Sequence, residues 1–410
     1  MCRVGDDPPS HLSEIKSLRI AAMNRYFTKT NLLAATALSG VVLFTGNTAL
    51  AQGKPAKIKL SLSGFFTSLV GFATQSSSFE KTSDADVAGT THYDSFNMVN
   101  DAEIHVSGST KLDNGLTVSV VVEFEANQVT ANGTGGGNGI DASYMAIDGK
   151  FGQIRLGSTQ PGSHDTANTA PLVGALGHDN SDTDNWIMKP ANSALGTPET
   201  GIGDGKVTKI AYVSPSIAGF QLGGSYEPTG SANSWEGMPR VGGVSGTETQ
   251  TYDVGIAYSG KMGKIDFSAD VQYYRVQGVA TASVDSLRGG ASITSGPFTI
   301  GGGYRELRDE DSGVSGTANS NDEETWEIGV TYAGSGWALG LTALGSEKPL
   351  SNANAGDDKV AKYLLGASYD LTSGVELLGS IAYVDWEDEL TVDSNNNSGF
   401  ALVAGIAVTF

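Results

Sequence analysis

Charged residues gather in and around one long segment, residues 158–205, which neither alternates like a strand nor repeats like a helix. The acidic residues of this segment that we single out are Asp165, Asp179, Asp182, Asp184, Glu199 and Asp204. The stretches on either side carry Arg155 and Lys209. Acids that face bases across a narrow space of low dielectric constant create a transverse field, which orients polar solutes. The chemistry that we expect of this region is therefore electrostatic.

Motifs for catalysis or for a fixed metal ion are absent from the sequence. The histidines outside the N-terminal leader, which show no metal-ligand spacing, are His92, His105, His164 and His178. There is no Gly-x-Ser-x-Gly elbow and no P-loop. Residues 136–141 match one calcium-binding repeat, but such repeats act in tandem copies. We predict no catalytic residue, metal or cofactor, and only loosely held divalent cations at the acid-rich runs 309–311 and 322–324.

The rest of the chain from residue 57 onward is dominated by short stretches in which apolar and polar residues alternate. This period of two is typical of strands that have one apolar and one polar face. In the last stretch, one face carries Phe400, Leu402, Ala404, Ile406, Val408 and Phe410. The predicted strands are 57–72, 95–110, 116–128, 140–148, 151–157, 206–213, 220–227, 250–259, 264–275, 285–294, 298–308, 323–333, 337–345, 359–370, 375–387 and 399–410.

Short turns and long polar loops alternate strictly between these strands. This asymmetry, together with an even number of strands, is typical of transmembrane β-barrels. No run of 18 or more apolar residues follows residue 51, so the sequence predicts no transmembrane helix. The predicted fold is an all-β, transmembrane antiparallel barrel of about 16 strands, with segment 158–205 folded into its pore.

The ionic residues of the strands mostly lie opposite the apolar face. A basic residue on the lipid face would cost about 2–4 kcal/mol at mid-bilayer, which gives this sorting a physical cause. The bases that we predict to line the pore wall are Arg155, Lys209, Arg305 and Lys362. Aromatic residues lie near strand ends, as in the girdles of membrane barrels: Phe220, Tyr226, Tyr258, Phe298, Tyr304, Tyr332, Trp337, Tyr369 and Tyr383.

The N-terminus reads as a leader followed by a signal peptide. Residues 23–51 combine a basic start, a short apolar run and a small-residue cleavage site at Ala49 and Ala51. Residues 1–22 do not fit this pattern, which leaves 52–410 as the barrel domain. Cleavage would remove five basic and three acidic residues, which changes the formal net charge from −20 to −22. So strong a negative charge argues against nucleic acid as a partner.

Three motifs resemble the Gram-negative general porins, especially the alphaproteobacterial ones. They are Leu112-Asp-Asn-Gly-Leu-Thr-Val118, Phe151-Gly-Gln-Ile-Arg-Leu-Gly157 and Tyr212-Val-Ser-Pro-Ser-Ile-Ala-Gly-Phe220. The last strand, with Ile406, Val408 and Phe410 on one face, is similar to the C-terminal assembly signature of outer-membrane barrels. Some porins carry Pro-Glu-Phe-Gly-Gly-Asp in the constriction loop, where this chain has the longer Pro198-Glu-Thr-Gly-Ile-Gly-Asp204 without the aromatic residue.

The resemblance implies a homotrimer of 16-stranded barrels in the outer membrane, inserted by the barrel-assembly machinery. It also implies that the loop after the fifth strand narrows a water-filled channel for ions and small hydrophilic solutes. The excess of acids suggests mild cation preference. Three alternatives remain open: a substrate-specific channel of this fold, a barrel enzyme, and a soluble β-sandwich or adhesin.

Overall fold

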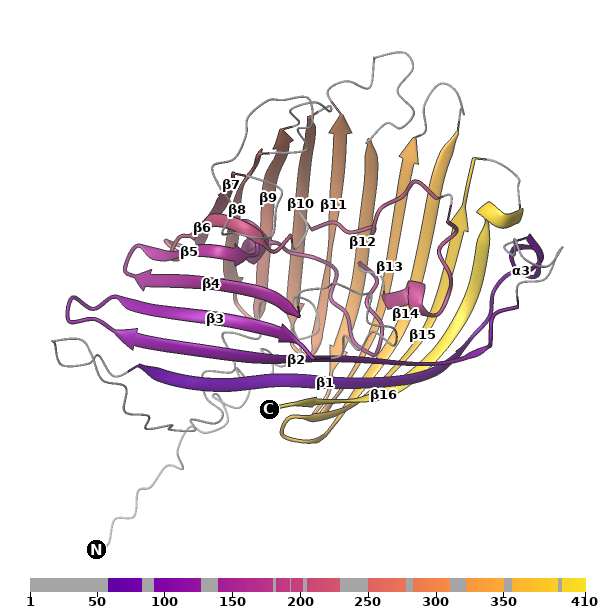
Figure 1. Ribbon diagram of the computed structural model, residues 1–410, viewed down its shortest axis with the longest axis horizontal. Coiled ribbons are helices and arrows are strands. Elements are labelled where there is room, and N and C mark those ends of the chain that lie inside the picture. Colours follow the sequence, from indigo (N-terminus) through magenta and orange to yellow (C-terminus); the bar gives the residue numbers. More distant parts are fainter. Residues whose placement is uncertain are drawn as a thin grey trace, which may run out of the picture.

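The computed structural model describes residues 58–82, 92–126, 139–179, 182–191, 193–201, 205–228, 250–277, 283–309, 322–349, 356–389 and 393–410. Sixteen strands form one closed antiparallel barrel (Figure 1). Every strand pairs with its neighbours in the sequence, and β1 closes the barrel against β16. The predicted fold class is confirmed, and the strand ends differ from the predicted ones by no more than four residues.

The strands are β1 (Lys59–Ala73), β2 (Phe96–Lys111), β3 (Thr117–Glu125), β4 (Ile140–Gly149), β5 (Gly152–Thr159), β6 (Val207–Val213), β7 (Phe220–Glu227), β8 (Gln250–Met262), β9 (Ile265–Gln277), β10 (Val284–Ser295), β11 (Phe298–Asp309), β12 (Glu323–Ala333), β13 (Trp337–Pro349), β14 (Asp357–Thr372), β15 (Val375–Glu387) and β16 (Asn397–Thr409). The helical pieces are α3 (Ser77–Thr82), η2 (His164–Thr166), η3 (Asp182–Asn185) and η4 (Asp393–Asn395). None of these described helices has both the length and the apolar character needed to cross a membrane.

The two faces of the strands differ as the alternation predicts. In β16, Phe400 and Leu402 are 59% and 58% exposed on the outer face, whereas Ala401 and Val403 between them are 1% and 0% exposed. Aromatic side chains meet on neighbouring strands in three groups of three and one pair: Phe220–Tyr258–Phe267, Phe298–Tyr332–Trp337, Tyr363–Tyr383–Phe400 and Phe72–Phe96. The first two groups lie at the short-turn end, where amphipathic rings favour a membrane interface.

The barrel is sealed where its first and last strands meet. The Gly64 amide donates to the Phe410 carbonyl at 2.9 Å, and the Phe410 amide donates to the Gly64 carbonyl at 3.0 Å. Ile406 and Val408 belong to β16, and Phe410 follows it directly. This closure satisfies backbone groups that lipid could not. The role of these three residues in assembly stays a prediction, and Ala49 and Ala51 lie outside the described residues.

Candidate functional site

Between β5 and β6, the described residues 160–179, 182–191, 193–201 and 205–206 lie inside the barrel and follow its inner wall (Figure 1). We call this segment the inner loop. Its backbone is held by side chains that point inward from strands far apart in the sequence, from β8 to β16. The predicted folding of this loop into the barrel is therefore confirmed.

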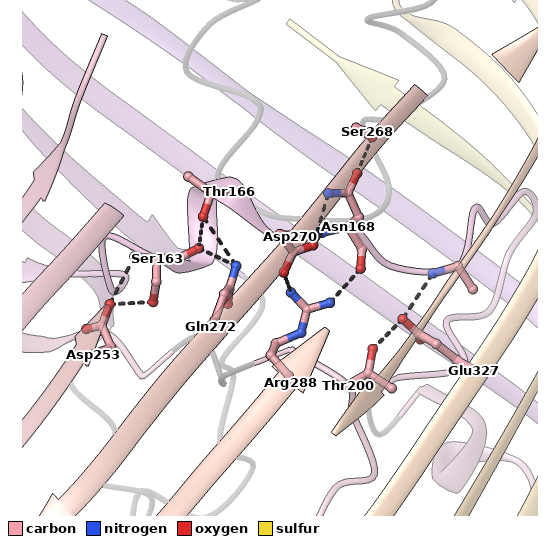
Figure 2. A network of polar contacts seen from close by, with 11 residues as sticks. Ser163, Thr166, Asn168, Thr200, Asp253, Ser268, Asp270, Gln272, Arg288 and Glu327 are labelled. Atoms are coloured by element: carbon pink, nitrogen blue, oxygen red, sulfur yellow. Dashed lines mark hydrogen bonds and ion pairs between the residues drawn. The ribbon is translucent and has the colours of Figure 1, made fainter. Parts of the chain in front are cut away.

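The first part of the inner loop is held by wall carboxylates. Asp253 of β8 accepts a hydrogen bond from the Ser163 amide at 3.0 Å. Asp270 of β9 accepts bonds from the Asn168 amide at 2.7 Å and from its side chain at 2.9 Å. Arg288 of β10 pairs with Asp270 and donates to the Asn168 carbonyl (Figure 2). Charge-assisted bonds of this kind are stronger than neutral ones, so they fix the path of the loop.

Glu327 of β12 ties two distant parts of the loop to one point on the wall. One carboxylate oxygen accepts from the Ala170 amide at 3.0 Å and from the Thr200 hydroxyl (Figure 2). The other oxygen is bonded to Nε2 of His178, which is fully buried. Burial opposes the charge on His178, but Asp179 and Glu327 outweigh it and raise the pKa of the imidazole. We call the contacts of Asp253, Asp270 and Glu327 with the loop the polar anchor.

The middle of the inner loop is held by apolar packing instead. Its side chains in this cluster are Leu172, Leu176, Trp186, Ile187 and Leu195. They pack on inward-facing wall residues of β1 and β14–β16: Leu69, Val360, Leu364, Ala382, Val384, Trp386, Ala401 and Val403. We call this cluster the apolar anchor. Its members are nearly inaccessible to water, so burial of apolar area stabilises the docked loop here.

Two inward-facing glycines let the loop backbone touch the wall. A Cβ atom on Gly366 would lie 1.6 Å from the carbonyl oxygen of Val173. A Cβ atom on Gly290 would lie 2.0 Å from the carbonyl oxygen of Asn168. Both distances are too short for any side chain, so these positions require glycine for a steric reason.

The predicted acids and bases do meet, but in contact. The ion pairs are Asp165 with Arg155 (2.8 Å), Glu199 with Arg305 (3.3 Å) and Asp184 with Lys362 (3.9 Å). The three bases lie on the inner side of the barrel, yet none is more than 6% exposed because the loop covers them. The charges therefore hold the loop to the wall rather than facing each other across a water-filled gap.

The other predicted residues have local partners. Lys209 lies 3.5 Å from Glu227 on the next strand. Asp182 accepts from the Gly177 amide at 3.1 Å. Burial raises the pKa of Asp179, and it also raises the pKa of Asp184 although Lys362 opposes the shift. Asp204 lies outside the described residues.

Sequence spacing did not reveal which histidines have acidic neighbours. His105 lies with Glu103 and Glu123, and His178 lies with Asp179 and Glu327, with the ligand atoms of each group within 4.8 Å of one another. The wall acids Asp253 and Glu327 of the polar anchor were missed as well, whereas Asp270 was expected on the ionic face of its strand. Their only signal in the sequence is that an acid falls on the inward face of a strand, as at Asp253 and Glu327.

A closed 16-stranded barrel with an apolar outer belt, ionic inward-facing residues and a loop inside it defines a class, the outer-membrane β-barrels. The family model of the Gram-negative porins matches residues 34–389, so the chain belongs to that family. The protein is accordingly an outer-membrane protein of the porin family.

Curated relatives and solved structures agree with this assignment. The "Monosaccharide porin" of Halomonas sp. and the "Major outer membrane protein" of Halomonas elongata are each 24% identical over 285 residues, which is 66% of this chain and 59% of theirs. This chain thus matches less than two thirds of their length. The anion-selective porin from Comamonas acidovorans is 16% identical with a TM-score of 0.56. The match covers 86% of this chain and 100% of the neighbour's chain. The trimer form of OmpT from Vibrio cholerae is 13% identical with a TM-score of 0.54, and covers 86% and 99%. At these identities, the structures show the fold alone.

Proposed function

We propose that the protein carries ions and small hydrophilic solutes passively across the outer membrane, without catalysis, through a lumen that the inner loop narrows. The observation that carries this proposal is the inner loop lying inside a closed barrel, held by both of its anchors. A loop fixed at many points gives a passage of constant shape, as size-limited diffusion requires.

We further propose a mild preference for cations. Support comes from the excess of acids on the inner wall at β2–β4. There, Glu103 and Glu125 lie opposite each other in the strand register. Lys206 is shared between Glu123 and Asp141. Rings of carboxylates favour cations in a narrow pore. The fold itself does not decide the sign, because the Comamonas acidovorans neighbour is anion-selective.

A homotrimer is the assembly that we propose, with outer-membrane lipid around it. The support is the family and the trimer form of the Vibrio cholerae neighbour. We also propose export by the signal peptide at 23–51 and insertion by the barrel-assembly machinery through the strand that contains Ile406 and Val408.

Single-channel recording in planar bilayers under a salt gradient tests the channel and its selectivity. The expected result is large, stable steps, grouped in threes for a trimer, and a reversal potential of the cation-selective sign. A reversal potential of the opposite sign overturns the cation preference alone. Absence of conductance from a barrel with normal heat-modifiable gel mobility overturns the open channel.

A sugar-specific channel is the second candidate, favoured by the name of the Halomonas sp. relative, "Monosaccharide porin". Liposome swelling separates the two candidates. General diffusion predicts rates that fall smoothly with solute size. A specific channel predicts faster entry of a monosaccharide than of an acyclic polyol of the same mass, together with saturation.

A further inference from the structure

Three carboxyl groups meet at the long-loop end of the barrel. Asp358 stands at the start of β14, and Asp388 and Glu389 follow the end of β15. Each offers one oxygen, and these oxygens all lie within 4.8 Å of one another. Two oxygens bound to one calcium ion at about 2.4 Å can be at most about 4.8 Å apart. The spacing therefore fits three ligands of a single ion.

The burial of Asp358 points to a missing positive partner. Its side chain is 0% exposed. One carboxylate oxygen accepts a hydrogen bond from the Ala194 amide of the inner loop. The other, Oδ1, is buried and has no hydrogen-bond partner among the described residues. A buried carboxylate oxygen without a partner is strongly unfavourable unless a cation or a proton compensates it.

No neighbouring base supplies that compensation. The adjacent residue, Lys359, already pairs with Glu347 at 3.2 Å and with Asp357 at 3.4 Å. Successive residues of a strand point to opposite faces, so the Lys359 side chain points away from that of Asp358. By contrast, the inward-facing wall acid Asp270 has its base, Arg288, in contact.

The second ligand is held in place by its own loop. The Asn395 side chain donates to one carboxylate oxygen of Asp388. The Asp388 amide donates to the Asn396 side-chain oxygen at 3.0 Å. Asp388 is thus oriented before any ion arrives, and preorganised ligands lower the free-energy cost of binding.

The third ligand, Glu389, is brought near β14 by a close backbone approach at Gly356. A Cβ atom on Gly356 would lie 2.3 Å from that of Glu389.

The other described groups with ligand spacing differ in having a basic or hydrogen-bonding partner in contact. In the groups that contain Glu103, Lys206 lies 3.2 Å from Glu123 and also pairs with Asp141, so it supplies a positive charge. In the group that contains His178, the carboxylate of Glu327 is already bonded to His178, Thr200 and the Ala170 amide. The three carboxylates at the long-loop end combine ligand spacing with a buried oxygen, Oδ1 of Asp358, that has no hydrogen bond from the described residues.

We propose that Asp358, Asp388 and Glu389 form a calcium-binding site, with water completing the coordination. Carboxylate oxygens in a flexible arrangement suit Ca²⁺ better than Mg²⁺, which demands near-ideal octahedral geometry. The ion ties the start of β14 to the connection between β15 and β16. Through the Ala194 amide on Asp358, it also stabilises the inner loop.

The test uses the full barrel refolded in detergent without lipopolysaccharide and stripped with a chelator. Calorimetric titration with Ca²⁺ is expected to show one ion per chain and a rise in melting temperature, with a weaker response to Mg²⁺. The double variant Asp358→Asn/Glu389→Gln is expected to lower the affinity at least about tenfold. The matched control is Asp393→Asn, an exposed acid of the same connection, which is expected to leave the affinity unchanged.

One measurement on the unaltered protein keeps the test valid if the double variant does not fold. Hydrogen exchange of the Ala194 amide is expected to slow when Ca²⁺ is added. No saturable Ca²⁺ binding, or full affinity in the folded double variant, overturns the proposal and leaves a proton shared among the carboxyl groups.

Discussion

The polar anchor and the apolar anchor hold the same loop to the same wall by different physics. At the polar anchor, three carboxylates of β8, β9 and β12 accept hydrogen bonds from backbone amides of the inner loop. They belong to Asp253, Asp270 and Glu327. At the apolar anchor, Trp186 and its neighbours bury their side chains on β14–β16 and β1. Hydrogen bonds fix direction but contribute modest net free energy, whereas burial contributes more and fixes direction less.

The comparison assigns a different task to each anchor. The apolar anchor contains no titratable side chain, so we expect its contribution to loop docking to depend little on pH. The polar anchor determines where the loop runs beside the charged wall and makes that path sensitive to protonation. The variants below separate the two tasks, from the largest expected effect to the smallest.

Trp186→Ala removes the largest loop side chain of the apolar anchor. It is expected to destabilise the docked loop by about 3–5 kcal/mol, because the loss of a buried tryptophan leaves a large cavity. Hydrogen exchange of the Ile187 amide is the measurement, with faster exchange expected. Trp326→Ala, the same change on the lipid-facing surface, is the matched control and is expected to leave this amide protected. Equal protection in both variants would refute the role of the apolar anchor.

Glu327→Gln keeps the shape of the polar anchor but removes its charge. It is expected to destabilise loop docking by about 1–3 kcal/mol, because the amide retains only one acceptor oxygen for His178, Thr200 and the Ala170 amide. Protease cleavage of the inner loop measures the effect. Glu324→Gln, which changes an outward-facing acid of the same strand β12, serves as the control. Cleavage faster than in Trp186→Ala would reverse the ranking of the two anchors.

Raising the pH above about 6.5 is expected to weaken the polar anchor. The pKa of His178 is raised in the folded protein by Asp179 and Glu327 against burial and Lys362. Its stabilisation is therefore complete below the ordinary value of 6.5 and is lost as the pH rises through the raised one. The slope cannot exceed about 1.4 kcal/mol per pH unit for one proton.

Thermal melting from neutral to alkaline pH measures that slope. His178→Gln is expected to abolish this contribution, whereas Trp186→Ala retains it because the polar anchor is intact in that variant. A slope that persists unchanged in His178→Gln would place the titrating group elsewhere.

Glu199→Gln is expected to have the smallest effect on stability, within about 1 kcal/mol, because its pair with Arg305 is partly exposed. Its effect should appear in selectivity instead. Loss of a negative charge beside Arg305 is expected to shift the reversal potential under a salt gradient toward the value for an anion-selective channel. Glu347→Gln, an acid at the strand end outside the barrel interior, is the control; an equal shift in both would argue for a general surface-charge effect.

The sequence predicted the barrel well because a period of two is a local property of each strand. It placed Arg155 and Lys362 on the inward face for the same reason. It did not predict that the loop covers them, because the path of an aperiodic segment depends on contacts made only in the folded barrel. Asp358 precedes Asp388 and Glu389 by 30 and 31 positions in the chain, so no local sequence pattern links the three acids.

The pairing of β1 with β16 also constrains the order in which the barrel can fold. β1 leaves the ribosome before the other strands and β16 after all of them, yet Gly64 and Phe410 are bonded to each other. Until β16 is added, the growing sheet has two open edges, each able to pair with a foreign strand. The barrel therefore cannot close before its last strand is in place, and the free edge of β1 is paired only at that final step.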